Sequence, residues 1–224
     1  MISKKLQNKI SDIEFKQMAY YFGIAIQVEH SNVTQKKCKS YFHGYRVIFL
    51  SGTLQLKNSR IAEGFLCWLL EFGHLLSPAK IRRLILAGYN FDHAILGGLI
   101  EFLTENNIMP NQWKIIRPFC KKMPSAQQLL DGPVPRSRSS YFLKYRIVAP
   151  QFQLNTHKFL LPVATVYKNC VELRNRALFG SVVNADVASY LQKNPNSTAY
   201  QIAKNTHHHK ARVFEVYEDV LAAG

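Results

Sequence analysis

The chain has 224 residues, of which 47% are hydrophobic, and it carries 29 Lys and Arg against 14 Asp and Glu. The hydrophobic share is too large for a disordered chain, and the length allows one or two domains. A formal net charge of +15 favours polyanionic partners, namely DNA, RNA or an anionic membrane surface. A basic protein without a nucleic-acid role is the alternative, because net charge does not say where the charges lie.

The cysteines and the apolar runs argue against a metal protein and a membrane protein. The four cysteines are far apart in the sequence: Cys38, Cys67, Cys120 and Cys170. Structural zinc sites bring their ligands in close pairs, so we expect no metal and no cofactor. Few cysteines and no signal peptide favour a cytoplasmic protein. Runs such as 64–70 and 94–100 are too short to span a bilayer, so we expect no membrane partner.

Two elements are predicted in the N-terminal part. A helix is predicted over 11–29, because its apolar residues recur near one face. Aromatic and branched residues surround the pair Ser51-Gly52 and predict a hairpin over 41–56.

The stretch 59–104 has the hydrophobic spacing of helices. Gly73 is expected to end the first of them. Ser77 followed by Pro78 is typical of an N-cap and a first helical position, and the helix that they open should stop at Gly88.

A third helix in this stretch is expected to begin after Asp92 as its cap. It is apolar nearly all round, which is typical of a buried helix. The pair Gly97-Gly98 within it indicates close helix packing, since no phosphate-binding loop surrounds it. The helices of 77–103 could instead form another helix-turn-helix. Their nearly continuous apolar sequence favours a place in the hydrophobic core.

A linker is predicted over 121–140, which is rich in Pro, Gly and Ser. It divides a basic helical N-terminal domain, 1–120, from a connecting segment and C-terminal domain, 141–224. Eight Lys and Arg lie between Lys114 and Arg146 with one acid, and aromatic residues lie among them. Cations bind phosphate and aromatic rings stack on bases, so Arg136 and Arg138 are candidate nucleic-acid-binding residues. The alternative is a solvated basic linker flanked by core aromatics.

The C-terminal residues 177–224 predict three helices. The first is expected over 185–192 and is broken by Asn194-Pro195-Asn196. Thr198 and Gln201 have the spacing of a capping box, which opens the second helix. After a turn at Asn205-Thr206 the third helix begins near His208. The apolar residues on one side of it are Val213, Val216, Tyr217 and Val220.

Three short motifs in this stretch are similar to those of a known family of domains. They are Leu178-Phe179-Gly180-Ser181, Gln201-Ile202-Ala203, and Val213, Tyr217 and Val220 before Ala222-Ala223-Gly224. With them the stretch resembles the winged-helix domains of bacterial transcription regulators, over about a fifth of the chain. The resemblance implies DNA binding, with the third helix in the major groove and the second against the backbone, and often a homodimer. The family continues into a two-stranded wing, whereas this sequence stops at Gly224, so the wing is missing or the chain is truncated.

The exposed side of the third helix is expected to contact DNA. At about 100° per residue, that side is basic in its first turn and acidic in the later turns, where Glu215, Glu218 and Asp219 would repel phosphate. Base contacts are expected from His208, His209, Lys210 and Arg212, and a phosphate contact is expected from Lys204. The alternative for each is a solvated surface side chain. The histidines 207–209 point about 100° apart and do not converge on one metal ion.

Two other classes of function stay open. The Leu-Phe-Gly-Ser phrase is similar to the opening of nucleotidyltransferase sites, but that chemistry needs a close acidic pair and only Asp186 follows. Gly-x-Ser-x-Gly and the Gly-x-x-x-x-Gly-Lys phosphate loop are also absent, so we do not expect an enzyme. A catalytic site assembled from distant positions would escape these patterns. The runner-up is a protein-interaction module, an antitoxin or an adaptor, that uses the acidic third helix.

The sequence therefore predicts a mainly α protein with minor β. A helical N-terminal domain should precede a C-terminal winged-helix-like domain with a helix-turn-helix. The expected function is DNA binding in transcriptional regulation, with a homodimer or a partner protein as a further expectation.

Overall fold

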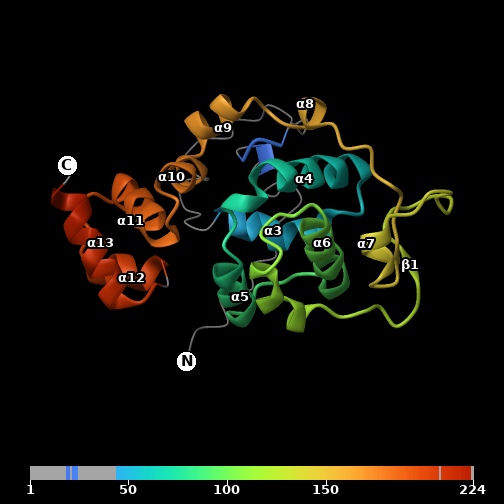
Figure 1. Ribbon diagram of the computed structural model, residues 1–224, viewed down its shortest axis with the longest axis horizontal. Coiled ribbons are helices and arrows are strands. Elements are labelled where there is room, and N and C mark those ends of the chain that lie inside the picture. Colours follow the sequence, from blue (N-terminus) through green and yellow to red (C-terminus); the bar gives the residue numbers. More distant parts are fainter. Residues whose placement is uncertain (1–18, 21, 25–43, 207, 223–224) are drawn as a thin grey trace. The chain divides into compact units, whose positions relative to one another are not determined.

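The computed structural model describes residues 19–20, 22–24, 44–206 and 208–222. Most of these residues are helical, and their one sheet has two strands, so the expectation of a mainly α chain with minor β is confirmed (Figure 1). Contacts divide the chain into two compact units: unit 1 includes Tyr45–Pro162, and unit 2 includes Val163–Gly224. None of the described helices is both long enough and apolar enough to cross a bilayer.

Unit 1 consists of short helices around an aromatic core, with a small sheet beside them. Its elements are α3 (Gly44–Gln55), α4 (Ser59–Phe72), η2 (Gly73–Leu75), α5 (Pro78–Leu86), α6 (His93–Glu105), η3 (Gln112–Ile115), η4 (Arg117–Phe119), β1 (Gln127–Gln128), α7 (Ser140–Leu143), β2 (Ile147–Val148) and α8 (Thr156–Phe159). Most of the helix predicted over 11–29 lies outside the described residues. Where that stretch is described, Ala19 and Tyr20 are helical, and Ile24 bridges to Leu160.

The hairpin predicted over 41–56 is wrong, because α3 occupies this stretch. Gly52, which suggested a turn, lies inside the helix. A Cβ added there would come within 2.7 Å of the Phe65 ring of α4, so this glycine provides room for a neighbouring helix. Phe49 of α3 is fully buried and stacks on Trp113 with ring centroids 5.5 Å apart. Burial of this helix face therefore prevails over the strand preference of its aromatic and branched residues.

The three helices predicted over 59–104 are confirmed as α4, α5 and α6. Pro78 is the first residue of α5 after Ser77, and that helix ends at Leu86, two residues before Gly88. The Asp92 carboxylate accepts hydrogen bonds at 2.9 Å from the N–H groups of Ala94 and Ile95, so it caps α6. Every residue from Ala94 to Leu103 is buried, as expected for a helix that is apolar nearly all round.

Close packing explains the glycine pair of α6. A Cβ on Gly97 would lie 2.2 Å from the Tyr145 ring, and a Cβ on Gly98 would lie 2.2 Å from the Phe142 ring. Because these distances are far below van der Waals contact, neither ring could keep its place against a larger residue. The two glycines thus seat α7 and the residues after it directly on the backbone of α6.

The stretch 121–140, predicted as a linker, lies within unit 1, and the division between the units falls between Pro162 and Val163. β1 lies inside the stretch and pairs in parallel with β2, Gln127 opposite Ile147. Leu129 and Ser139 are buried, and the Ser139 N–H donates to the Ala149 carbonyl at 3.0 Å. This Pro- and Gly-rich stretch is an ordered connection within unit 1. Its composition alone does not distinguish it from a linker between domains.

We expect Gly98→Ala to destabilise unit 1 by about 1–3 kcal/mol, because the methyl group would overlap the Phe142 ring. Both tryptophans of the chain, Trp68 and Trp113, are buried in unit 1, so urea unfolding followed by tryptophan fluorescence measures this unit. Ala79→Ser is the matched control: it adds one atom on the exposed side of α5 and should change stability by less than about 0.5 kcal/mol. An unchanged midpoint for Gly98→Ala would contradict the packing argument.

Candidate nucleic-acid interface

The described residues of unit 2 include five short helices, and the last three occupy stretches that were predicted to be helical. They are α9 (Val163–Asn169), α10 (Val171–Phe179), α11 (Val182–Lys193), α12 (Ala199–Thr206) and α13 (Lys210–Ala222). The helices predicted over 185–192, after Thr198 and near His208 are confirmed as α11, α12 and α13. Residues 205–206 complete α12 instead of forming the turn, and α13 begins at Lys210, so three residues separate the two helices. A turn of three or four residues between two helices is the hallmark of a helix-turn-helix.

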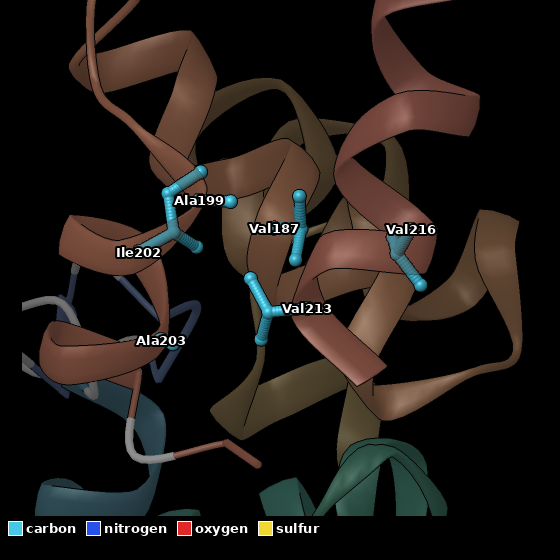
Figure 2. Packing of buried hydrophobic residues seen from close by; sticks show 6 residues of the cluster. All are labelled: Val187, Ala199, Ile202, Ala203, Val213 and Val216. Carbon is cyan, nitrogen blue, oxygen red and sulfur yellow. The ribbon is translucent and has the colours of Figure 1, made fainter. Parts of the chain in front are cut away.

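Small aliphatic residues form the core of these three helices. The buried set is Val187, Ala199, Ile202, Ala203, Val213 and Val216. Figure 2 shows the side chains of Val187 from α11, Ile202 from α12 and Val213 from α13 gathered in this cluster. Tyr217 and Val220 pack against the set from α13, as the periodicity predicted. Because the contacting residues are small, the helix backbones come close, and the orientation of α13 depends on few side chains.

Local hydrogen bonds fix the start of α12. The Gln201 side chain accepts from the Thr198 N–H at 2.8 Å, and the Gln201 N–H donates to the Thr198 hydroxyl at 3.3 Å. These reciprocal bonds confirm the predicted capping box.

The Leu-Phe-Gly-Ser phrase forms the junction between α10 and α11. Gly180 follows the last residue of α10 with φ +61°, a conformation that favours glycine. Ser181 then precedes α11 as its N-cap residue. The phrase therefore has a structural role at a sharp helix connection, while Leu178 and Phe179 remain exposed.

His208 does not lie on the exposed side of α13, contrary to the expectation that it contacts DNA. Its ring Nε2 lies 2.9 Å from a carboxylate oxygen of Asp186, and both side chains are more than nine-tenths buried. The pair links the turn to α11, so His208 holds the start of α13 in place. Helical periodicity missed this because His208 precedes α13, where the 100° rule does not apply. The sequence signal for the pair is a lone carboxylate, Asp186, at a core-facing position of α11.

The other predicted residues of unit 2 are exposed around the turn. Lys204 is exposed near the end of α12, while His209, Lys210 and Arg212 are exposed at the start of α13. The Lys210 ammonium lies 4.4 Å from the centre of the Tyr200 ring, a cation–π contact between α13 and α12. Tyr200 was not expected from the sequence to take part in this surface. These five exposed residues, Lys204, His209, Lys210, Arg212 and Tyr200, form what we call the turn surface.

The electrostatic character of α13 changes along its length. Arg212 pairs with Glu215 one turn on, and Glu218 and Asp219 are also exposed. Val163–Gly224 holds seven Lys and Arg against five acids, so most of the chain's positive charge belongs to the residues before it. A phosphate would therefore be attracted to the first turn of α13 and repelled by the later turns.

Arg136 and Arg138 belong to unit 1, whereas the turn surface belongs to unit 2. Both arginines are exposed on the crossing that leads from β1 to α7. Arg138 is held by an isolated backbone bridge to Pro150. Each basic surface is therefore described within its own unit.

Thiol and metal chemistry have no evident site in the described residues. Within 19–20, 22–24, 44–206 and 208–222, no group of three His, Cys, Asp or Glu is placed to hold a metal ion. Burial raises the pKa of the Cys67 and Cys170 thiols, and it raises the pKa of Cys120 to about 12. These thiols are protonated at neutral pH, which is the opposite of what a nucleophilic cysteine requires.

Comparisons of the chain with protein families, with curated proteins and with solved structures found no match.

We expect Asp186→Ala to destabilise unit 2 by about 3 kcal/mol, because it leaves His208 without this carboxylate in a buried position. Hydrogen exchange of the amides in 182–222, read by mass spectrometry, measures the loss. Tryptophan fluorescence reports unit 1 and should not change. Asp219→Ala removes an exposed acid from α13 and serves as the control, with a change below about 0.5 kcal/mol. Equal exchange in the two variants would refute the bracing role of the pair.

Proposed function

We propose that this chain is a DNA-binding protein of the cytoplasm that acts as a transcriptional regulator and contacts DNA through α12 and α13. The observation that carries the proposal is the short separation of these helices, with α12 ending at Thr206 and α13 beginning at Lys210, and with exposed cations on both helices. In a helix-turn-helix the second helix enters the major groove by its N-terminal residues, and the first helix crosses the backbone. Lys210 and Arg212 occupy the N-terminal turn of α13, where such contacts are made.

Each side chain of the turn surface has a role that fits its chemistry. Arg212 and Lys210 would donate to guanine O6 and N7, and His209 would contact a neighbouring base edge. Lys204, near the end of α12, would bind a phosphate. The Tyr200 ring holds the Lys210 ammonium next to α12, which restricts its motion before DNA arrives.

The intramolecular partners of the two cations do not oppose this role. The Arg212–Glu215 pair is exposed, and exposed pairs one helical turn apart contribute about 0.3–0.5 kcal/mol. A bidentate contact of arginine with guanine is worth about 1–3 kcal/mol, so Arg212 would exchange Glu215 for a base. The acids further along α13 limit insertion to its first turns.

A second candidate function is protein interaction through the later turns of α13. Phe214 is 46% exposed there, beside Glu215 and Glu218. An apolar ring rimmed by acids suits a basic protein partner, such as the toxin of an antitoxin or a client of an adaptor. A second copy of this chain would also satisfy it, and regulators of this kind often dimerise to read two half-sites.

We expect Lys210→Ala with Arg212→Ala to weaken binding to a mixed-sequence 30-bp duplex about 10- to 100-fold, since two base or phosphate contacts are lost. Fluorescence anisotropy at several salt concentrations measures both affinity and salt dependence. Lys57→Ala with Arg60→Ala removes the same charge from exposed positions near the start of α4 and is the matched control. Equal affinities for the two double variants would reject the proposal.

The protein-interaction alternative predicts a different effect of substitutions in the later turns of α13. If α13 serves a protein partner, Glu215→Ala with Glu218→Ala abolishes its capture, and duplex binding is weak in every variant. For the DNA-binding proposal, the same change removes repulsion next to the groove and leaves duplex affinity unchanged or stronger.

A further inference from the structure

Two basic segments of unit 1 that are distant in sequence meet at one place. The Met123 N–H donates to the Tyr145 carbonyl at 3.1 Å, and the Gln127 N–H donates to the Arg146 carbonyl at 3.0 Å. The Arg146 guanidinium also donates to the Pro124 and Met123 carbonyls. Lys121 and Lys122, which directly precede Met123, therefore lie close to the chain from Lys144 to Arg146.

The buried carboxylate of Glu101 forms ion pairs with two cations of this region. One Glu101 oxygen lies 2.8 Å from the Lys144 ammonium, and the other lies 3.4 Å from the Arg117 guanidinium. The Glu101 side chain is 9% exposed, whereas those of Lys144 and Arg117 are about half exposed. The hydrogen bond with Glu101 raises the pKa of Lys144, so this lysine is cationic at any physiological pH. Glu101 thus anchors two cations that remain about half exposed.

This cluster has an excess of positive charge. We call it the basic ledge: Arg117, Lys121, Lys122, Lys144 and Arg146. The nearby carboxylates are those of Glu101 and Glu105, the latter 3.5 Å from Lys144. Lys121 and Lys122 are exposed and form no ion pair within the part of the chain that the structure describes. Five cations against two carboxylates produce a positive potential that only an external anion can offset.

The backbone at the ledge is held in an unusual conformation. Arg146 has φ +60°, which is uncommon for any residue other than glycine. Hydrogen bonds of its guanidinium to two carbonyls and of its own carbonyl to Gln127 maintain it. Such positions persist only where the surroundings enforce them, and they concentrate at functional sites. Hydrogen bonds therefore hold the backbone that carries Arg146 against the chain that follows Lys122.

The aromatic residues beside the ledge are used for packing. Phe142 is buried against Gly98, and the Tyr145 ring lies on Gly97. Tyr141 meets Phe102 edge to face, with ring centroids 5.3 Å apart. Single-stranded nucleic acids are bound by rings that are free to stack on bases. Since these rings already have partners, the ledge is suited to phosphates rather than to unstacked bases.

We propose that the basic ledge is a second, sequence-independent binding surface for the phosphate backbone of double-stranded DNA. This inference rests on the proposed function, because duplex DNA is the polyanion that the turn surface would already hold. The turn surface of unit 2 would read bases, and the ledge of unit 1 would add affinity for phosphates without reading sequence.

The test is duplex binding by Lys121→Ser with Lys122→Ser, measured by anisotropy on a 30-bp mixed-sequence duplex between about 50 and 200 mM salt. A plot of log affinity against log salt has a negative slope, and each lost phosphate contact makes it less steep by about 0.9. The loss of two contacts should therefore make the slope less negative by about two. Affinity should fall about tenfold, and equally for every duplex sequence. The matched control Lys57→Ser with Arg60→Ser should keep the wild-type slope. Both double variants alter exposed side chains and should unfold as the wild type does.

Comparison with Lys210→Ala and Arg212→Ala separates this inference from the proposed function. If the α13 variant weakens binding and the ledge variant does not, the inference is overturned and the proposed function stands. If only the ledge variant weakens binding, the ledge inference stands and the helix-turn-helix proposal fails. If neither variant differs from the control, both are overturned.

Two further probes test the identity of the polyanion. A single strand of the same length that binds more tightly than the duplex, with the loss confined to that strand, would overturn the assignment to duplex DNA. Phosphatidylserine vesicles test an anionic membrane. If the ledge variant loses vesicle binding and keeps duplex binding, the ledge is a membrane-facing surface and the proposal is wrong.

Discussion

The absence of two side chains on α6 is the constraint on which the rest of unit 1 depends. Because Gly97 and Gly98 carry no Cβ, the rings of Tyr145 and Phe142 rest on the helix backbone itself. That contact fixes α7, and through α7 it fixes β2 and the strand pairing with β1. It also sets Lys144 above Glu101, so the same close approach that fills the core arranges the charges of the basic ledge.

Unit 2 is organised by a different principle, in which a small aliphatic core is supplemented by polar links. Valine and alanine side chains around Val213 bury little area each, so they define the helix orientations only in part. Polar contacts add to that definition: Asn175 of α10 donates to Ser189 of α11, and the Lys193 ammonium lies 3.0 Å from Glu172. With Asp186 and His208, these links join α10, α11 and the turn into one support for α13.

The sequence predicted the elements whose signals are local. Asp92, Ser77 with Pro78, and the Thr198–Gln201 box marked helix starts, because capping is a matter of a few neighbouring residues. The hairpin over 41–56 failed because Gly52 serves a contact with Phe65, a residue thirteen positions away, and local composition carries no record of such a contact. The linker over 121–140 failed for the same reason, since its order comes from pairing with β2.

For the candidate sites as well, the sequence predicted what depends on local pattern and missed what depends on tertiary contacts. Exposure of Lys204, Lys210 and Arg212 followed from helical periodicity, which places charged residues opposite the core. The burial of His208 did not follow, because its carboxylate partner is twenty-two residues earlier. The basic ledge was visible only as a run of cations, and its assembly around Glu101 depends on tertiary contacts.

Between α12 and α13, buried and exposed side chains stand next to each other, and this affects which positions can change. His208 is committed to the interior, whereas the exposed residues next to it, His209, Lys210 and Arg212, make no contribution to the helical core. In the proposed DNA-binding role, substitutions at these three positions would alter the surface that contacts DNA and leave the buried set of unit 2 unchanged. In that role, a change of DNA target would require no compensating change in the buried core of unit 2, so binding preference and foldability would be separable properties of this chain.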